Sequence, residues 1–149
     1  MNNINTLIGF STMAFSSFTV ALECNLRVPE QVKLQDGVHI EFSVTNPSAT
    51  AAIFLPWYTP IEGFWSDMFY IQREEGQVLK YEGPLAKRSS PSQADHLTLA
   101  GDTTLTAALD LSLVYRFDVG RYTLTFKQHA DQLPCLYSLQ QSWLINIEP

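Results

Sequence analysis

Apolar and polar residues alternate along this chain with a period of two, and this alternation is the feature that most constrains its fold. Residues 38–44 show it most clearly, because valine, isoleucine, phenylalanine and valine alternate there with histidine, glutamate and serine. A period of two is that of a β-strand with one buried and one exposed face. Asp36-Gly37 precedes this run and Asn46-Pro47-Ser48 follows it, and both sequences favour turns. We therefore predict a half-buried strand between two turns.

Short runs of the same kind recur along the chain, whereas helical periodicity is nearly absent. A single helical turn is predicted near residues 111–115. Short strands separated by frequent turns are typical of two packed sheets. The predicted fold class is therefore all-β, an immunoglobulin-like antiparallel β-sandwich of about 7–9 strands. The further strands are expected at residues 51–55, 68–73, 77–81, 97–99, 103–109, 121–127 and 143–147.

One local signal supports the sandwich. The segment Asp118-Val119-Gly120-Arg121-Tyr122 has the spacing of a tyrosine corner. In this motif a tyrosine at the start of a late strand hydrogen-bonds to the backbone of the preceding turn. A glycine turn that precedes a strand by coincidence would give the same residues. Within an all-β pattern we expect the corner.

The first 21 residues differ in composition from the rest of the chain. They contain no Asp, Glu, Lys or Arg, have an apolar centre from Leu7 to Phe18 and end in small residues. This is typical of a secretory signal peptide cleaved near Ala21, although the usual Lys or Arg before the apolar centre is missing. Serine and threonine dilute the run, which disfavours a transmembrane anchor; a first element of the domain is the other alternative. We expect a signal peptide at residues 1–21 and a sandwich domain at 22–149, in a secreted or periplasmic protein with no membrane association after cleavage.

The charge balance excludes one class of partner. The chain has 9 Lys and Arg against 15 Asp and Glu, for a net charge of −6. An acidic protein without a basic run is a poor nucleic-acid binder. No nucleic-acid partner is therefore expected.

Two cysteines, Cys24 and Cys135, are present in the chain. In an exported domain they are expected to form a disulfide. Such a bond would close nearly the whole domain, and loop entropy would then stabilise the fold by roughly 4–5 kcal/mol. Two buried free thiols are the alternative. Neither cysteine has the spacing of a zinc site or of a redox pair.

Two segments fit no strand, and both are long for connections in a compact domain. We call Pro56–Ser66 the aromatic loop and Glu82–Asp95 the basic loop. The basic loop holds Lys87-Arg88, the only adjacent basic pair in the chain. The aromatic rings of the first loop are expected to cap the core, since aromatic residues are usually buried, and a basic pair on a loop is usually solvated. The alternative is that both loops form a contact surface. The candidate contact residues are Trp57, Tyr58, Ile61, Glu62, Phe64, Trp65, Lys87 and Arg88.

Motifs for catalysis are missing from the sequence. There is no HExxH, GxSxG, phosphate-binding loop or CxxC. His39 and Glu41 would lie on the same face of a strand, which could form a metal pair but is more often a solvated face. We therefore expect a protein that is not an enzyme and has no metal or cofactor.

Three stretches together resemble a known family: "WYTPIEGFWSDMF", "YEGPLAKRSSP" and "ADHLTLAGDTTLTAALDLSLVYRFDVGRYTLTF". They are similar to the amino-terminal β-sandwich prodomain of secreted zinc endopeptidases of the deuterolysin and peptidyl-lysine metalloendopeptidase family. That prodomain has a TPLEG-like loop, a GPxxKR loop, a D-x-x-TL strand and a closing G-x-Y-T strand. The resemblance covers about residues 26–127. The sequence reaches Pro149 without the zinc motif of the family's catalytic domain, so we expect a stand-alone copy of the prodomain.

The resemblance implies a function in trans. A free-standing prodomain would bind a secreted zinc metalloendopeptidase, as an inhibitor or as a chaperone-like partner. The family favours lysine at the cleaved bond, so Lys87 or Arg88 would enter the specificity pocket while the aromatic loop packs on its rim. An exported immunoglobulin-like binding or structural module without a protease partner is the alternative. A metal-binding sandwich that uses His39 and Glu41 is a third hypothesis.

Overall fold

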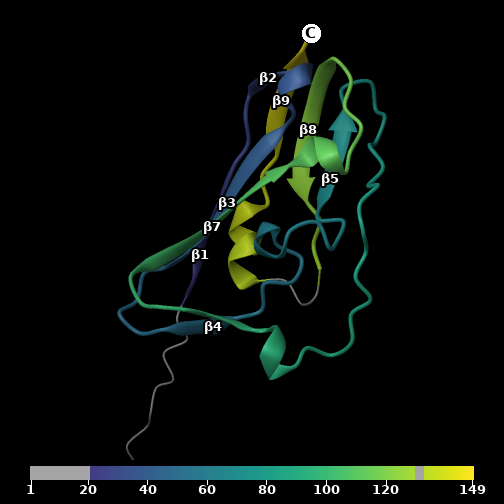
Figure 1. The fold of residues 1–149 in the computed structure, drawn as a ribbon. Coiled ribbons are helices and arrows are strands. Elements are labelled where there is room, and N and C mark those ends of the chain that lie inside the picture. Colours follow the sequence, from purple (N-terminus) through teal and green to yellow (C-terminus); the bar gives the residue numbers. More distant parts are fainter. Residues whose placement is uncertain (1–20, 130–132) are drawn as a thin grey trace, which may run out of the picture.

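The computed structural model describes residues 21–129 and 133–149 (Figure 1). Residues 1–20, which hold nearly all of the expected signal peptide, lie outside the described residues, and that expectation stays a prediction. None of the described helices is long and apolar enough to cross a membrane.

The described part of the chain contains nine strands and five 3₁₀ helices. The strands are β1 (Glu23–Arg27), β2 (Gln31–Lys33), β3 (His39–Asn46), β4 (Ala52–Phe54), β5 (Phe69–Arg73), β6 (Leu97–Leu99), β7 (Thr103–Asp110), β8 (Gly120–Phe126) and β9 (Trp143–Glu148). The 3₁₀ helices are η1 (Leu34–Asp36), η2 (Pro60–Glu62), η3 (Gln93–Asp95), η4 (Leu111–Leu113) and η5 (Pro134–Leu139).

The strands form a β-sandwich, as predicted. One sheet has the order β1-β3-β7 and the other β2-β9-β8-β5. All pairs in the two sheets are antiparallel except β2 with β9, which run parallel. β4 and β6 form a separate two-stranded pair. The parallel pair is the one departure from the expected antiparallel arrangement within the described residues.

The core lies between the two sheets, and the alternation in sequence explains which residues fill it. In β3 the side chains of Ile40, Phe42 and Val44 are at most 2% exposed, whereas His39 and Glu41 face solvent. Tyr122 and Leu124 of β8 and Ile145 and Ile147 of β9 are buried in the same way from the opposite sheet. Each strand thus supplies one apolar face, which is what a two-layer sandwich requires.

One predicted strand is reduced to a short contact. Of the strands predicted at residues 68–73 and 77–81, the first is observed as β5, but the second makes a single bridge, between Gln72 and Val78. Two backbone hydrogen bonds accompany it, from Leu79 N to Ile71 O and from Arg73 N to Gln77 O. From there the chain leaves the sheet and runs irregularly into the basic loop.

The buried side chain of Asn46, the last residue of β3, bonds to the segments that lead into β4 and out of β6. Its amide nitrogen donates to the carbonyls of Thr50 (2.8 Å), Leu99 (3.1 Å) and Ala100 (3.2 Å). Its oxygen accepts a hydrogen bond from Ser48 N at 3.1 Å. β4 and β6 therefore continue the ribbon at an angle and place Phe54 and Leu99 against the core (Figure 1).

The tyrosine corner is confirmed. The Tyr122 hydroxyl donates to Asp118 O and accepts from Asp118 N, both at 3.0 Å. The ring is 2% exposed and contacts Phe117 edge-on, with ring centroids 5.3 Å apart. The corner therefore fixes the turn that leads into β8.

We expect the substitution Tyr122→Phe to lower the free energy of unfolding by about 1–3 kcal/mol, because both backbone groups of Asp118 lose their partner. Urea unfolding followed by tryptophan fluorescence measures this change. Tyr70→Phe is the matched control, because Tyr70 is 40% exposed on β5 and its change should stay within about 0.5 kcal/mol. Equal effects of the two substitutions would contradict a structural role for the corner.

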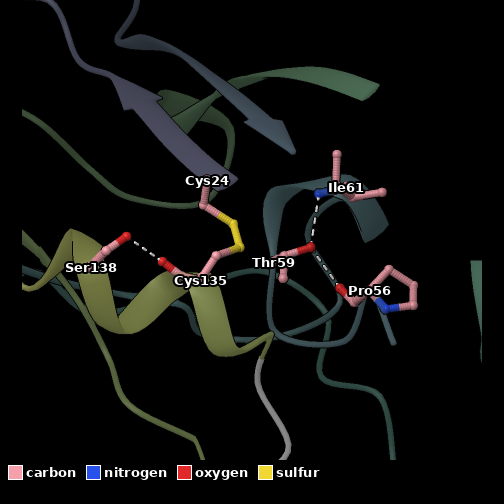
Figure 2. The surroundings of a disulfide bond; sticks show 6 residues. All are labelled: Cys24, Pro56, Thr59, Ile61, Cys135 and Ser138. Atoms are coloured by element: carbon pink, nitrogen blue, oxygen red, sulfur yellow. Dashed lines mark hydrogen bonds between the residues drawn. A yellow bond between two sulfur atoms is a disulfide. The ribbon is translucent and has the colours of Figure 1, made fainter. Parts of the chain in front are cut away.

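The predicted disulfide between Cys24 and Cys135 is also confirmed. The two residues are 111 positions apart in sequence, and their Cα atoms lie 5.3 Å apart. The bond joins β1 to η5, and Thr59 and Ile61 of the aromatic loop lie around it (Figure 2). The covalent link therefore supports the same end of the sandwich that carries the aromatic loop.

Candidate binding surface

The aromatic loop is a tightly bonded turn. The buried Thr59 hydroxyl donates to Pro56 O at 2.6 Å and accepts from Ile61 N at 3.2 Å, which caps η2. Tyr58 has a positive φ of 60°, an uncommon conformation for a non-glycine residue. Its ring stacks on His129 with centroids 4.2 Å apart. The proline and the threonine therefore build local structure where the alternation pattern predicted none.

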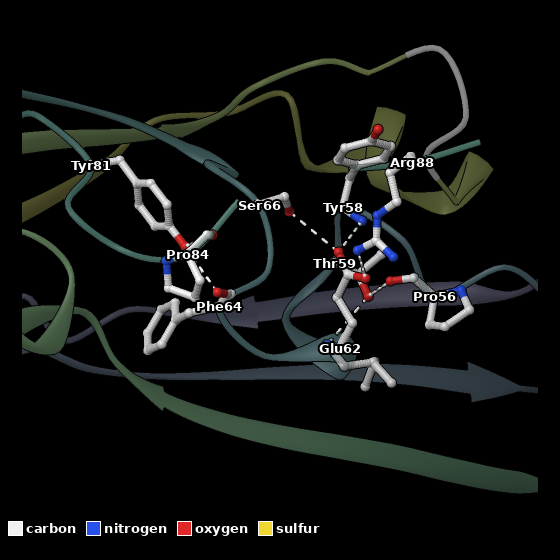
Figure 3. A network of polar contacts seen from close by, with 10 residues as sticks. Pro56, Tyr58, Thr59, Glu62, Phe64, Ser66, Tyr81, Pro84 and Arg88 are labelled. Atoms are coloured by element: carbon white, nitrogen blue, oxygen red, sulfur yellow. Dashed lines mark hydrogen bonds and ion pairs between the residues drawn. The ribbon is translucent and has the colours of Figure 1, made fainter. Parts of the chain in front are cut away.

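Glu62 connects the aromatic loop to the basic loop (Figure 3). Its carboxylate accepts hydrogen bonds from Tyr58 N at 2.7 Å and from Ser66 Oγ at 3.3 Å. The other carboxylate oxygen forms an ion pair with the guanidinium of Arg88. The side chains of this pair are only 9% and 20% exposed, so water screens it less than a surface pair. The guanidinium also lies 4.6 Å from the centroid of the Trp57 ring.

A second set of contacts joins the loops further along. Ala86 N donates to Trp65 O at 2.9 Å. The Tyr81 hydroxyl lies 3.0 Å from the carbonyl oxygens of both Phe64 and Pro84 and is the donor to them (Figure 3). Burial, with a further contribution from nearby carboxylates, raises the pKa of Tyr81, so this hydroxyl keeps its proton at neutral pH. The two loops thus form one connected unit.

The structure separates the candidate residues into two groups. Trp57 is buried, at 6% exposure, and Arg88 is half-buried. The half-buried members of the aromatic loop are Tyr58, Ile61, Glu62 and Phe64. These six residues are therefore less exposed than the other two candidates.

Trp65 and Lys87 are the two candidates that lie at the surface. The Trp65 side chain is 54% exposed and Lys87 is exposed as well. Leu85, which is not among the contact residues predicted from the sequence, is 69% exposed and lies beside them. Leu85 and Lys87 flank Ala86, whose N–H donates to Trp65 O. We call Trp65, Leu85 and Lys87 the exposed loop patch. Exposure alternates along residues 85–88, and this alternation places Leu85 on the same side of the segment as Lys87.

A polar cluster at Asp67 anchors the end of the aromatic loop. The carboxylate accepts a hydrogen bond from the Tyr115 hydroxyl at 2.8 Å and forms an ion pair with Lys127. The Tyr81 ring packs edge-on against Tyr115, with centroids 5.5 Å apart. Burial, followed by the hydrogen bond and the charge of Asp67, raises the pKa of Tyr115 well above its usual value.

This raised pKa predicts a loss of stability in alkali. An unfolded tyrosine loses its proton near pH 10, whereas Tyr115 keeps its proton in the folded state. The unfolded state then binds fewer protons, so the contribution is complete below pH 10 and declines above it, by up to about 1.4 kcal/mol per pH unit. Urea unfolding at pH 8 to 11 should show a smaller decline for Tyr115→Phe than for the wild type. Parallel pH curves would contradict the assignment.

The hypothesis of a metal pair receives no support from the positions of its residues. His39 Nε2 lies 2.9 Å from Asp36 O, whereas the Glu41 carboxylate pairs with Arg27 at 3.3 Å. Within residues 21–129 and 133–149, no three His, Cys, Asp or Glu side chains lie together as a metal site would require. His39 and Glu41 therefore have separate partners.

The chain matches no protein-family profile. It is 29% identical over 92 residues to an extracellular protease of Aeromonas hydrophila, a match that covers 61% of this chain and 26% of that protein. The chain thus corresponds to about a quarter of that protein's length. The match and the disulfide both agree with an extracellular location. The chain is therefore similar to one part of an extracellular protease.

Among solved structures, a mutant β-glucosidase from Listeria innocua in complex with laminaribiose aligns with 87% of this chain and 16% of its own. The TM-score is 0.43 and the sequence identity 10%. A likeness at this level carries no argument about function.

Proposed function

We propose that this chain is a secreted, non-catalytic domain that binds a zinc metalloendopeptidase in trans through the exposed loop patch and inhibits or chaperones it. The observation that carries the proposal is the position of Lys87. Its side chain is exposed, while both of its neighbours are anchored, Ala86 to Trp65 and Arg88 to Glu62. The similarity to part of an extracellular protease supports a protease as the partner.

Lys87, and not Arg88, is the charged group available to an acidic pocket. The Arg88 guanidinium is already neutralised by Glu62 and packed on the Trp57 ring. The Lys87 ammonium makes no ion pair among the described residues, and the described part of the chain offers it no hydrogen-bond partner. A long cation that is held only by its backbone can enter a pocket without first breaking internal contacts.

The anchoring of the loops favours tight binding. Ordering a flexible loop on association costs about 0.5–1.5 kcal/mol for each immobilised side chain. Here the disulfide, the Glu62–Arg88 pair and the Tyr81 contacts fix the loops before a partner arrives. Trp65 and Leu85 add exposed apolar area beside the cation, and aromatic side chains often dominate interface energies.

The direct test uses purified protein that begins at residue 22. The protein is added to a secreted zinc endopeptidase that selects lysine at the cleaved bond, and hydrolysis of a lysine-containing peptide is followed. Inhibition is expected at micromolar concentration or below. A parallel assay refolds the denatured enzyme with and without this protein, which distinguishes a chaperone from an inhibitor. A folded sample without effect in both assays would overturn the proposal and favour a binding or structural module.

A further inference from the structure

We infer that two sets of contacts hold both chain ends in place when a peptidase cuts at Lys87, so that the domain resists being consumed as a substrate. The first set, which we call the clamp, joins Arg88 to Glu62, Trp57 and Tyr58. The second is the hydrogen bond from Ala86 N to Trp65 O. This inference rests on the proposed function. It concerns a different property from binding, namely what happens to the loop after it has entered a catalytic cleft.

Residues 85–88 have the shape of a peptide substrate. Their exposure alternates, with Leu85 and Lys87 exposed and Ala86 and Arg88 half-buried, as in an extended strand. Ala86 N donates to Trp65 O, and in an extended segment the N–H and C=O groups of the neighbouring Leu85 and Lys87 would point the other way. No backbone hydrogen bond in the described part of the chain uses those groups. A cleft that binds extended peptides can therefore pair with this edge.

On the carboxyl side of Lys87, Arg88 is held by three different groups. Its guanidinium pairs with Glu62 and lies 4.6 Å from the centroid of Trp57 and 6.0 Å from that of Tyr58. Glu62 is itself held by Tyr58 N and by Ser66 Oγ. Glu62 is thus a positioning residue, which acts on the segment through Arg88. Its polar contacts go to Tyr58 N, Ser66 Oγ and the Arg88 guanidinium.

On the amino side, the anchors are the hydrogen bond from Ala86 to Trp65 and the contact of Pro84 O with Tyr81. The disulfide adds a covalent constraint, because residues 85–88 lie within the loop that Cys24 and Cys135 close. A single cut at Lys87 therefore leaves both fragments joined through the sulfur atoms. Neither new end can diffuse away from the other.

The chemistry follows from this arrangement. Hydrolysis adds one water across a peptide C–N bond and leaves a carboxylate on one residue and an amine on the next. The reverse condensation expels the same water and reforms the bond on the enzyme. Groups held side by side react with effective concentrations far above those of free molecules. The anchors therefore make resynthesis compete with dissociation, and the cut form does not accumulate.

Two variants remove the clamp in different ways. Glu62→Gln removes the charge that holds Arg88 and leaves the residues that enter the cleft unchanged. Arg88→Ala keeps the Glu62 bonds to Tyr58 N and Ser66 and removes only the clamped side chain. Arg116→Ala is the matched control, because Arg116 forms a 2.8 Å ion pair with Glu82 of the same loop, in which the Arg116 side chain is 87% exposed.

Each protein is incubated with the lysine-selecting zinc endopeptidase described above, and intact mass after reduction measures cutting on either side of Lys87. We expect Glu62→Gln and Arg88→Ala to accumulate the cut form at least about ten-fold faster than the wild type and to lose inhibition with time. The wild type and Arg116→Ala should remain mostly intact. Thermal unfolding checks that each variant is folded. If Glu62→Gln does not fold, the Arg88→Ala variant alone tests the inference.

The outcomes separate this inference from the proposed function. Variants that inhibit at first and stay as intact as the wild type would overturn the inference and leave the binding function standing. A wild type that is itself cut quickly at Lys87 would also overturn it. A wild type that neither inhibits nor is cut would overturn the inference, and the proposed function falls with it when the refolding assay shows no effect either.

Discussion

Replacing Cys24 and Cys135 together by alanine is expected to lower the free energy of unfolding by about 4–5 kcal/mol. The two residues are separated by 111 positions, so the disulfide closes a long loop and lowers the conformational entropy of the unfolded chain. Such a loss is a large share of the stability of a domain of this size, which is typically about 5–15 kcal/mol. Urea unfolding of the variant and of the wild type measures the difference.

The wild type in strong reductant is the matched control, and it should unfold at nearly the same urea concentration as the double variant. The aromatic loop should be affected as well, because Thr59 and Ile61 lie around the disulfide (Figure 2). Inhibition by the variant should therefore weaken before the core unfolds. A change in stability below about 1 kcal/mol would show that β1 and η5 hold together without the bond.

Lys87→Ala is expected to weaken inhibition of the zinc endopeptidase at least about 30-fold, which corresponds to about 2 kcal/mol of binding free energy. Losing one partner of a buried charge pair costs this much or more, because the acidic group in the pocket is left unpaired. The inhibition constant of each protein is measured against the same peptide substrate at a fixed salt concentration.

Lys33→Ala controls for the loss of one positive charge. Lys33 is exposed on β2, at the end of the sandwich where the C-terminus lies (Figure 1). This variant should inhibit within about two-fold of the wild type, since a distant exposed charge acts only through a screened field. Equal effects of the two substitutions would assign the role of Lys87 to general electrostatic attraction. An unchanged inhibition constant for Lys87→Ala would contradict the proposal that the protein binds its partner through the exposed loop patch.

Most strands could be predicted from the sequence because each carries its own signal. β3 and β8 alternate over at least five residues, and every second residue is apolar at 105, 107 and 109 of β7 and at 143, 145 and 147 of β9. Such a pattern is a local property of the side chains. β1 and β2 were both missed. β2 has only three residues and exists through its parallel pairing with β9, more than a hundred positions away. The second arm after β5 was overestimated, since only Val78 bridges to the sheet.

The sequence predicted which segments form the candidate site, but not which of their residues are exposed. The two loops were identified by their length and composition, yet Trp57 and Trp65 have the same chemistry and differ only in burial. Glu62 and Arg88 form an ion pair although they are 26 positions apart, and no local sequence pattern predicts such a pair. Arg88 was therefore grouped with Lys87 as a contact residue, whereas the structure holds it inside the clamp.

The sequence by itself determined the features that depend on neighbours along the chain: the alternating strands, the turns and the corner of Tyr122. Only the tertiary structure decided which loop residues are buried, which are exposed and which lie against one another. The physical reason is that strand periodicity is encoded residue by residue. The burial of a ring or the pairing of a charge depends on segments that meet only after the two sheets have packed.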